Sequence, residues 1–303
     1  MGQSHDTIKT SPATRVIFDK KGNNGFTICG RDIPAELPAE LLAEIFCRVD
    51  LKTLLNCQLV CKRWWIVIQN YIWRKKTELT LGKPIPRREE IPWHAFYLIC
   101  KRKPFERNLV KNHSGEQEMK HWEICNHSHC WLVENPVWWP EMPLTEPIFE
   151  GKETCFVTFY NCTKRQLVDL VAEGLHPYVL DVLQPPIVVS EWYSCESNFQ
   201  PVVYEVHVEL LACRGKDNRI LDKFQFRDTI EDERQEQWLH ISHVFENYGA
   251  GLRKINFLHS GMSESFWEFD GCKMAGACIC VKIPPVTTYT YDDESDTPSI
   301  LDE

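Results

Sequence analysis

The spacing of apolar residues changes once along this chain, and that change sets its fold class. From Pro38 to about Thr77, apolar residues recur at three- and four-residue steps, which is the period of an amphipathic helix. After about Trp122, short runs alternate apolar and polar residues between proline, glycine and asparagine turns, which is typical of β-strands. The chain is therefore predicted to be an α+β protein of two domains, with a small helical unit, a boundary near residue 90, and an antiparallel β-sandwich or barrel.

The helical unit is short and divides into three predicted helices. Asp50 is the predicted N-cap of the second helix, because its carboxylate can accept hydrogen bonds from the first turn. The tryptophan-rich stretch 64–73 lies in the third, and a further helix is predicted over 93–103. Leu55 and Leu59 are expected to point inward. Three short helices have little core of their own, so part of the apolar face is expected to meet a partner.

The strongest strand signal lies at 202–210, where valine, tyrosine and leucine alternate with glutamate and histidine. Many short strands of this kind are typical of an antiparallel sandwich. One helix is predicted to interrupt them at 165–173, ending at Gly174, since glycine is favoured just after a helix. The other predicted strands are 154–159, 187–192, 223–226, 239–245, 252–258 and 277–283.

Composition and charge narrow the class of protein. The length of 303 residues suggests two domains, and a formal charge of −9 argues against a protein that coats nucleic acid. Six acidic and no basic residues lie in the last twelve positions, which are predicted to be disordered. The basic stretch 62–88 is interpreted as a solvated face or a contact for an acidic partner. Without a signal peptide or an apolar span, the protein is expected to be cytoplasmic.

The 14 cysteines raise three alternatives: disulfides, a metal site or a reduced core. Thiols stay reduced in a cytosolic protein, so most are predicted to be small core residues, among them Cys57, Cys61, Cys278 and Cys280. The stretch 125–130 holds two cysteines and two histidines, which are residue types that bind zinc. Four ligands within six residues cannot easily surround one ion, so no metal is predicted.

Two segments of the helical unit resemble the F-box. They are IPAELPAELLAEIF at 33–46 and LVCKRW at 59–64, and their order and spacing match over about 40 residues. The resemblance implies docking on the Skp adaptor, which links an F-box protein to a cullin and a RING protein. The alternative is that the apolar residues of these segments form only the internal core of the helical unit. The run 60–64 is expected to contribute both to that core and to the adaptor surface. The residues assigned to the adaptor surface are Leu37, Pro38, Leu41, Leu42, Ile45, Phe46, Val60, Cys61 and Trp64.

The rest of the chain resembles the FBA (F-box-associated) domain of the sugar-recognising F-box protein family. The matching stretches are 93–97, 107–109, 169–174, 184–189, 191–194, 241–251 and 259–261. The resemblance implies an antiparallel β-sandwich of the galactose-binding-like jelly-roll type. It also implies the boundaries: a flexible segment at 1–33, the F-box at 34–78, a helical linker at 79–105, the FBA domain at 106–286 and an acidic tail at 287–303.

The same resemblance implies a function. A chain with both modules is expected to be the substrate-recognition subunit of an SCF (Skp–cullin–F-box) E3 ubiquitin ligase. Such a subunit needs no catalytic residue and no cofactor, since it acts by raising the local concentration of target lysines. Several family members bind the inner core of high-mannose N-glycans on misfolded glycoproteins returned from the ER, which leads to ER-associated, proteasomal degradation.

A sugar site needs an aromatic platform for the apolar ring face and polar groups for the hydroxyl rim. In sugar-binding members, Tyr-Trp-Lys lies where this chain has Phe266, Trp267 and Glu268. A second aromatic residue of the family's site falls at Phe159, and its acidic sugar contact falls at Asn198. The resemblance therefore keeps two aromatic platforms and alters the polar rim.

Several alternatives stay open at this point. The two aromatic platforms can be ordinary packing at the end of a sandwich, and the FBA domain can bind a protein ligand without a glycan. The chain can also be a lectin-like chaperone module that binds glycoproteins without ubiquitination. An enzyme is not expected, because the sequence has no nucleophile elbow, zinc-protease motif or phosphate-cradling glycine loop.

Overall fold

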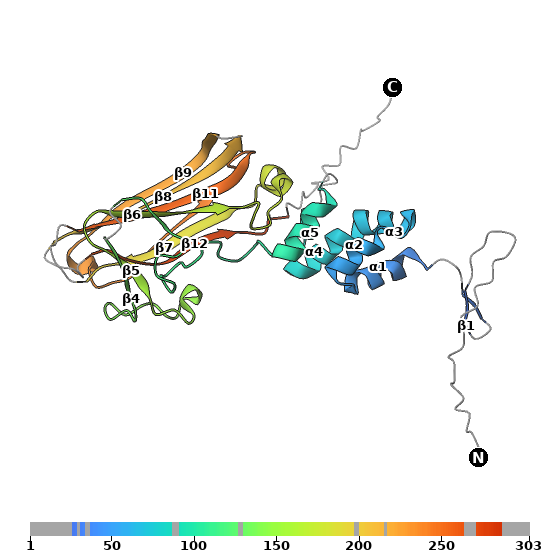
Figure 1. Ribbon diagram of the computed structural model, residues 1–303, viewed down its shortest axis with the longest axis horizontal. Coiled ribbons are helices and arrows are strands. Elements are labelled where there is room, and N and C mark those ends of the chain that lie inside the picture. Colours follow the sequence, from blue (N-terminus) through green and yellow to red (C-terminus); the bar gives the residue numbers. More distant parts are fainter. Residues whose placement is uncertain are drawn as a thin grey trace, which may run out of the picture. The chain divides into compact units, whose positions relative to one another are not determined.

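The computed structural model describes residues 26–28, 31–33, 37–86, 91–126, 130–196, 200–214, 217–263 and 271–286. Its contacts divide the chain into two compact units, Met1–Ile72 and Trp73–Glu303. The first unit is mainly helical, and the second holds two helices and two antiparallel sheets (Figure 1). The predicted α+β class and the antiparallel sandwich are confirmed.

Most of the residues that the structure describes in the first unit lie in short helices: α1 (Ala39–Arg48), α2 (Leu51–Cys57), α3 (Lys62–Val67) and the π-helical turn η1 (Ile68–Ile72). The predicted cap is confirmed, because Asp50 Oδ1 accepts the N–H groups of Lys52 and Thr53, each at 3.0 Å. Trp64 packs edge-on against Phe46 with ring centroids 5.1 Å apart. The buried apolar side chains of this unit are Leu42, Phe46, Leu54, Ile68 and Ile72.

A short hairpin precedes these helices. Its strands β1 (Phe26–Ile28) and β2 (Arg31–Ile33) pair antiparallel. The hairpin lies within the range 1–33, so part of the segment expected to be flexible has regular structure. The acidic tail at 287–303 lies outside the described residues.

Two helices open the second unit, α4 (Trp73–Leu81) and α5 (Trp93–Arg102). The rings of Trp73 and Trp93 stack at 5.7 Å with an interplanar angle of 26°. The buried Thr77 hydroxyl donates to the Trp73 carbonyl at 2.8 Å, which satisfies a polar group inside this apolar contact. The helix predicted over 93–103 is present as α5.

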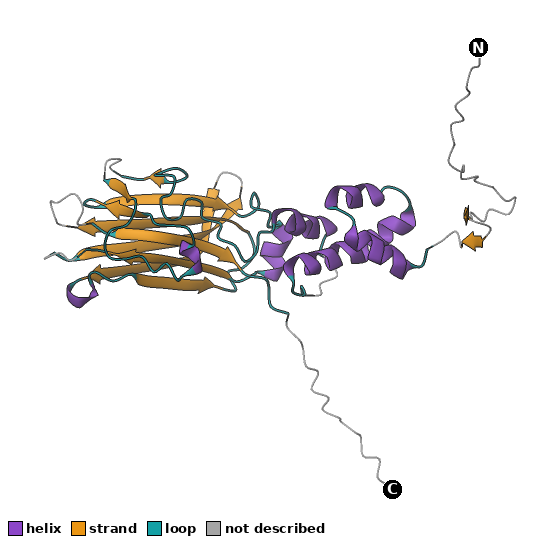
Figure 2. Ribbon diagram, turned by 90° about the horizontal axis from the view of Figure 1, so that it is seen from below, coloured by secondary structure: helices purple, strands orange, loops and turns teal. Residues whose placement is uncertain are grey.

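The sandwich in the second unit consists of two five-stranded antiparallel sheets (Figures 1 and 2). The first sheet has the order β10-β7-β12-β5-β4, and the second has the order β3-β6-β11-β8-β9. The first comprises β4 (Trp131–Glu134), β5 (Cys155–Thr158), β7 (Ile187–Ser194), β10 (Leu239–Phe245) and β12 (Lys273–Val281). The second comprises β3 (Glu123–Ile124), β6 (Cys162–Asp169), β8 (Val202–Arg214), β9 (Asp217–Ile230) and β11 (Leu252–Ser263). Three short turns, η2 (Pro147–Phe149), η3 (Val179–Leu183) and η4 (Asp232–Arg234), lie between strands.

The alternation at 202–210 produces the strand that it predicts. Val206 and Val208 are buried, whereas Glu205, His207 and Glu209 are half-buried on the other face of β8. The predicted strand at 239–245 matches β10 exactly in its bounds, and the one at 223–226 lengthens into β9. These outcomes follow from the two-residue period of a strand with one buried face.

The helix predicted at 165–173 is wrong. Residues 165–169 belong to β6, which pairs with β11 and alternates between buried and more exposed residues, and residues 170–173 form a turn. The buried face of β6 holds Lys164 and Gln166 as well as Val168. Polar residues at buried positions hide the two-residue hydrophobic period, so the sequence pattern favoured a helix. Gly174 does have positive φ, at 107°, in the turn that follows β6.

Candidate functional site

The apolar face of α1 divides into an exposed row and a buried row. Leu41 and Ile45 are 52% and 48% exposed, and Leu37 is similarly exposed just before the helix. Because helical residues four apart lie one above the other, these side chains follow one side of the helix, and we call Leu37, Leu41 and Ile45 the α1 row. Leu42 and Phe46 are 3% and 2% exposed and belong to the internal packing of the unit.

The turn between α2 and α3 adds to the exposed apolar surface. Val60 and Cys61 are exposed, and Leu59, which was predicted to point inward, is 79% exposed. The prediction for Leu59 is wrong because α2 ends at Cys57, so the helical period does not continue into the turn. Cys61 is likewise an exposed N-cap of α3 rather than a core thiol.

Two other residues of the predicted adaptor surface lie at its margin, and two further exposed residues were not predicted. Pro38 is the exposed N-cap of α1, and Trp64 is half-buried against Phe46. Trp65 and Ile66 are both exposed, although the sequence pattern did not single them out as surface residues.

In the second unit, two pairs of strand ends mark one end of the sandwich. Ser194, the last residue of β7, pairs with Lys273, the first residue of β12. Ser263, the last residue of β11, pairs with Val202, the first residue of β8. The connections 195–201 and 264–270 therefore both leave from this end, which we call the loop end.

The predicted glycan-site residues belong to connections at the loop end. Phe159 follows the last residue of β5 and is half-buried. Asn198, Phe266, Trp267 and Glu268 lie outside the described residues. Their flanking residues nevertheless show that the chain brings all three connections to the same end of the sandwich.

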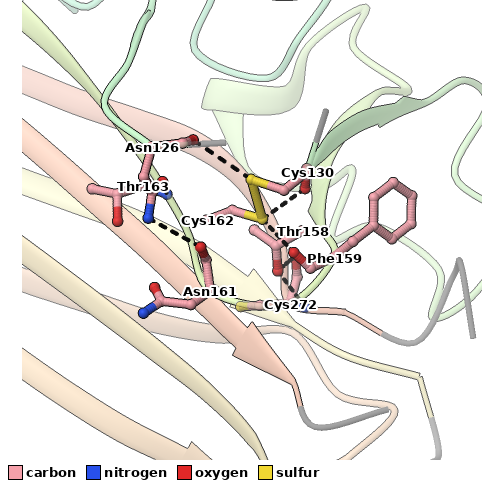
Figure 3. Close-up of a disulfide and its surroundings, with 8 residues drawn as sticks. All are labelled: Asn126, Cys130, Thr158, Phe159, Asn161, Cys162, Thr163 and Cys272. Carbon is pink, nitrogen blue, oxygen red and sulfur yellow. Dashed lines mark hydrogen bonds between the residues drawn. A yellow bond between two sulfur atoms is a disulfide. The ribbon is translucent and has the colours of Figure 1, made fainter. Parts of the chain in front are cut away.

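A reciprocal pair of hydrogen bonds joins Thr158, the residue before Phe159, to Cys272. The N–H of Thr158 donates to the carbonyl of Cys272, and the N–H of Cys272 donates to Thr158 Oγ1, each at 3.0 Å. Gly271 lies against the Thr158 backbone, where a Cβ atom would meet the carbonyl oxygen at 1.4 Å. Phe159 therefore adjoins the residues that directly follow the connection 264–270 (Figure 3).

A disulfide joins Cys130 to Cys162 beside Phe159, with Cα atoms 5.8 Å apart (Figure 3). The phenylalanine ring points away from this disulfide. Of the zinc-binding residue types in 125–130, Cys125 is exposed and Cys130 lies beside Cys162, and His127 and His129 lie outside the described residues. The described residues include eleven free cysteines. Reduced thiols are thus the majority, as predicted, with one pair as the exception.

Tyr160 is a surface residue that the sequence analysis missed. Its side chain is 54% exposed, and its backbone has a positive φ of 58°. A bulky residue in this left-handed conformation is uncommon, and here it lies in the short connection between β5 and β6. The signal available in the sequence is the aromatic pair Phe159–Tyr160 followed by Asn161 at the end of a strand.

Comparison with known proteins decides the family. The model of the F-box associated region (FBA) matches residues 100–281, and the F-box-like model matches residues 34–78. The chain belongs to the FBA family of F-box proteins. F-box only protein 6 of Rattus norvegicus is 33% identical over 260 residues, covering 82% of this chain and 88% of that protein. F-box only protein 17 of Homo sapiens is 36% identical over 182 residues, covering 59% and 62%, and F-box only protein 2 of Bos taurus is 31% identical over 240 residues, covering 75% and 76%.

This membership establishes the general role. F-box proteins with an FBA domain are substrate-recognition subunits of SCF ubiquitin ligases, so the predicted class of protein is confirmed. Among the residues that the structure describes, no helix is both long and apolar enough to cross a membrane.

The FBA domain has a polar cluster inside the sandwich. Glu191 accepts a hydrogen bond from the Tyr204 hydroxyl at 2.5 Å, and its other oxygen lies 2.6 Å from His259 Nδ1. All three side chains are buried. Burial lowers the pKa of His259, against the opposing effect of the Glu191 carboxylate. The imidazole stacks between the indoles of Trp122 and Trp131, at centroid distances of 4.7 and 5.7 Å.

Lys164 lies in the same interior and is fully buried. Its ammonium group lies over the rings of Trp122 and Trp131, at 4.8 and 4.2 Å, and over Phe156. Within the described part of the chain, its Nζ has no hydrogen-bond partner. Burial lowers the pKa of Lys164 well below its ordinary value of 10.5, and the Glu191 carboxylate only partly opposes this effect.

Lys164→Met is expected to raise the free energy of unfolding at pH 7 by about 1–4 kcal/mol, since methionine fills similar volume without a buried amine. Below pH 10.5 the unfolded chain holds a proton that the folded chain binds less well, so the wild type gains stability as pH rises. The advantage of the variant should therefore shrink between pH 7 and pH 9 in urea denaturation. Lys282→Met is the control, because hydrogen bonding to Glu106 raises the pKa of Lys282. A variant no more stable than wild type, with the same pH dependence, would show that Lys164 keeps its proton in the core.

Proposed function

We propose that this F-box protein binds N-glycosylated, misfolded glycoproteins through the loop end of its FBA domain and presents them to an SCF ubiquitin ligase in the cytoplasm. The observation that carries the proposal is the convergence of three connections, 159–161, 195–201 and 264–270, at one end of the sandwich. These connections contain every residue that the family resemblance assigns to glycan binding. The modified target would then follow the route of ER-associated, proteasomal degradation.

The adaptor surface in this proposal is the α1 row together with the exposed turn of Leu59, Val60 and Cys61. Their side chains are available at the surface of the helical unit, whereas Leu42 and Phe46 support them from inside. Exposed apolar side chains in such numbers favour a protein partner. The partner is the Skp adaptor, which connects the chain to a cullin and a RING protein. The chain itself acts by proximity and supplies no reacting group.

Two aromatic side chains at the loop end support a sugar ligand. Phe159 offers a ring face, and Tyr160 adds an exposed ring with a hydroxyl group. A pyranose needs both kinds of contact, because its C–H faces are apolar and its rim is polar. In the proposed site, Tyr160 supplies a phenolic hydroxyl where Phe266 lacks one, and Trp267 supplies the second platform.

Binding to an array of high-mannose glycans tests this proposal. The wild-type chain is expected to bind, and Trp267→Ala and Phe159→Ala are each expected to weaken binding about ten-fold or more through loss of a stacking face. Trp65→Ala is the matched control, because this exposed indole lies in the helical unit rather than in the FBA domain.

The outcome also separates the alternatives. No binding of any glycan by the wild type would favour a protein ligand without a glycan. Strong glycan binding combined with target turnover that is insensitive to cullin inhibition would favour a lectin-like chaperone without ubiquitination. Equal binding by the wild type and both aromatic variants would place the sugar site elsewhere in the chain.

A further inference from the structure

Two adjacent tryptophans are exposed on the segment that connects β4 to β5. Trp138 is 79% exposed and Trp139 is 48% exposed. The same segment also holds buried apolar side chains, because Met142 and Phe149 pack against Cys155, Val157 and Ala275 on the first sheet, whereas Leu144 is 56% exposed. The first sheet therefore offers this segment a core, yet both indoles lie outside it.

The backbone that carries these indoles is fixed at three consecutive residues. Trp138 N–H donates to Glu134 Oε1 at 2.8 Å, Lys273 Nζ donates to the Trp139 carbonyl, and Trp238 Nε1 donates to the Pro140 carbonyl at 3.0 Å. Lys273 is itself buried and forms ion pairs with Glu134 at 2.6 Å and Glu196 at 2.7 Å. Large side chains on a backbone fixed in advance lose little entropy on binding, which is how aromatic contact residues gain affinity.

The segment that carries the indoles is acidic. The connecting segment carries Glu141, Glu146, Glu150 and Glu153, all exposed, and its one basic residue, Lys152, pairs with Glu116 at 2.6 Å. An acidic rim attracts a cationic ligand and repels an anionic one. Indole rings are the preferred aromatic partners of ammonium and guanidinium groups.

This surface adjoins the loop end. Lys273 lies two residues after Gly271, and Glu196 lies two residues before Asn198, so one buried ion-pair cluster holds both the Trp139 backbone and the bases of the two glycan connections. A glycoprotein whose sugar occupies those connections would bring its polypeptide alongside the indoles. A second contact of this kind raises the affinity for one target without a stronger sugar site.

We propose that Trp138 and Trp139 form a second target-contact surface of the FBA domain, which binds a lysine- or arginine-bearing segment of the target polypeptide. The proposal rests on the proposed function in one respect, that the FBA domain is where the target binds. It adds the chemical class of the polypeptide contact, which the glycan site does not determine.

Fluorescence anisotropy tests the proposal on the full chain in complex with the Skp adaptor. The probes are two labelled, unglycosylated 12-residue peptides that share apolar residues and differ in carrying four lysines or four glutamates. The lysine peptide is expected to bind and the glutamate peptide to bind at least about ten-fold more weakly. Trp138→Ala/Trp139→Ala is expected to reduce lysine-peptide affinity about ten-fold or more, and Glu141→Lys/Glu146→Lys should reduce it as well.

Controls separate this proposal from the glycan site and from misfolding. Leu79→Ala, at an exposed leucine of α4, should bind the lysine peptide like the wild type. Trp267→Ala should lose glycan binding and keep peptide binding, so a failed sugar site leaves this result readable. The thermal unfolding midpoint of the double tryptophan variant should match the wild type, because both indoles are exposed.

Three results would overturn the proposal. One is lysine-peptide binding that is unchanged in the double tryptophan variant. Another is equal wild-type affinity for the two peptides, which would remove the charge argument. The third is loss of high-mannose glycan binding in that variant without any peptide binding by the wild type, which would make the indoles a sugar platform.

Discussion

A chain carrying Leu41→Glu and Ile45→Glu is expected to lose co-purification with the Skp adaptor. Both side chains belong to the α1 row, and in an apolar interface each new carboxylate would have to be desolvated or left unpaired. That penalty is several kcal/mol per charge, and a loss of about 3 kcal/mol already reduces affinity more than a hundred-fold. The expected result is therefore near-complete loss of the complex.

The fold of the variant should survive, which makes the result interpretable. Leu41 and Ile45 are about half exposed, and neither belongs to the buried set of Leu42 and Phe46. Circular dichroism and the urea midpoint should therefore stay close to wild type while co-purification fails. Leu79→Glu, an equally apolar and exposed position on α4, should retain the adaptor. A double variant that still co-purifies at wild-type yield would exclude the α1 row as the docking surface.

The same variant separates receptor from chaperone. If the chain delivers targets to the ligase, the double variant should bind glycans normally yet leave its targets unmodified. If the chain acts without ubiquitination, target turnover should not depend on the adaptor surface at all. The two surfaces can be tested independently, because the α1 row and the loop end lie in different compact units.

The parts of the fold that the sequence predicts correctly depend on interactions between residues close together in the chain. The Asp50 cap depends only on a carboxylate two and three residues before the N–H groups that it binds. The strand β8 shows its period because its inward positions are apolar throughout. Where Lys164 and Gln166 occupy inward positions of β6, the same rule fails, since tertiary partners in the interior override the pattern of one strand.

Surface exposure is harder to predict than secondary structure. Leu59 and Leu42 are the same residue type in one small unit, and only the end of α2 and the packing of α1 make one exposed and the other buried. The backbone of the exposed pair Trp138–Trp139 is likewise held in part by Lys273, which lies 134 residues further along the chain and gives no signal in the local sequence pattern. The expected cytosolic location favours reduced thiols for the 14 cysteines. Cys130 and Cys162 nevertheless meet, because β4, which begins directly after Cys130, pairs with the end of β5, a few residues before Cys162.

Gly271→Ala is expected to be the most damaging single substitution at the loop end. A Cβ atom on Gly271 would lie 1.4 Å from the carbonyl oxygen and 2.5 Å from the carbonyl carbon of Thr158. These are backbone atoms, so no side-chain rotation can relieve the overlap. The chain must separate the end of β5 from the start of β12, where Thr158 and Cys272 exchange two hydrogen bonds.

The loss of those contacts should lower the free energy of unfolding and also weaken glycan binding. Overpacking costs about 1–3 kcal/mol and each lost hydrogen bond about 1 kcal/mol, so the free energy of unfolding should fall by roughly 3 kcal/mol or more. Because Phe159 directly follows Thr158, glycan-array binding should fall with it. Gly82→Ala is the control: it has positive φ but no atom within 4 Å of its new Cβ, so its cost should stay near 1 kcal/mol. Urea denaturation of both variants decides the matter, and a Gly271→Ala chain as stable as Gly82→Ala would mean that β12 does not begin against Thr158.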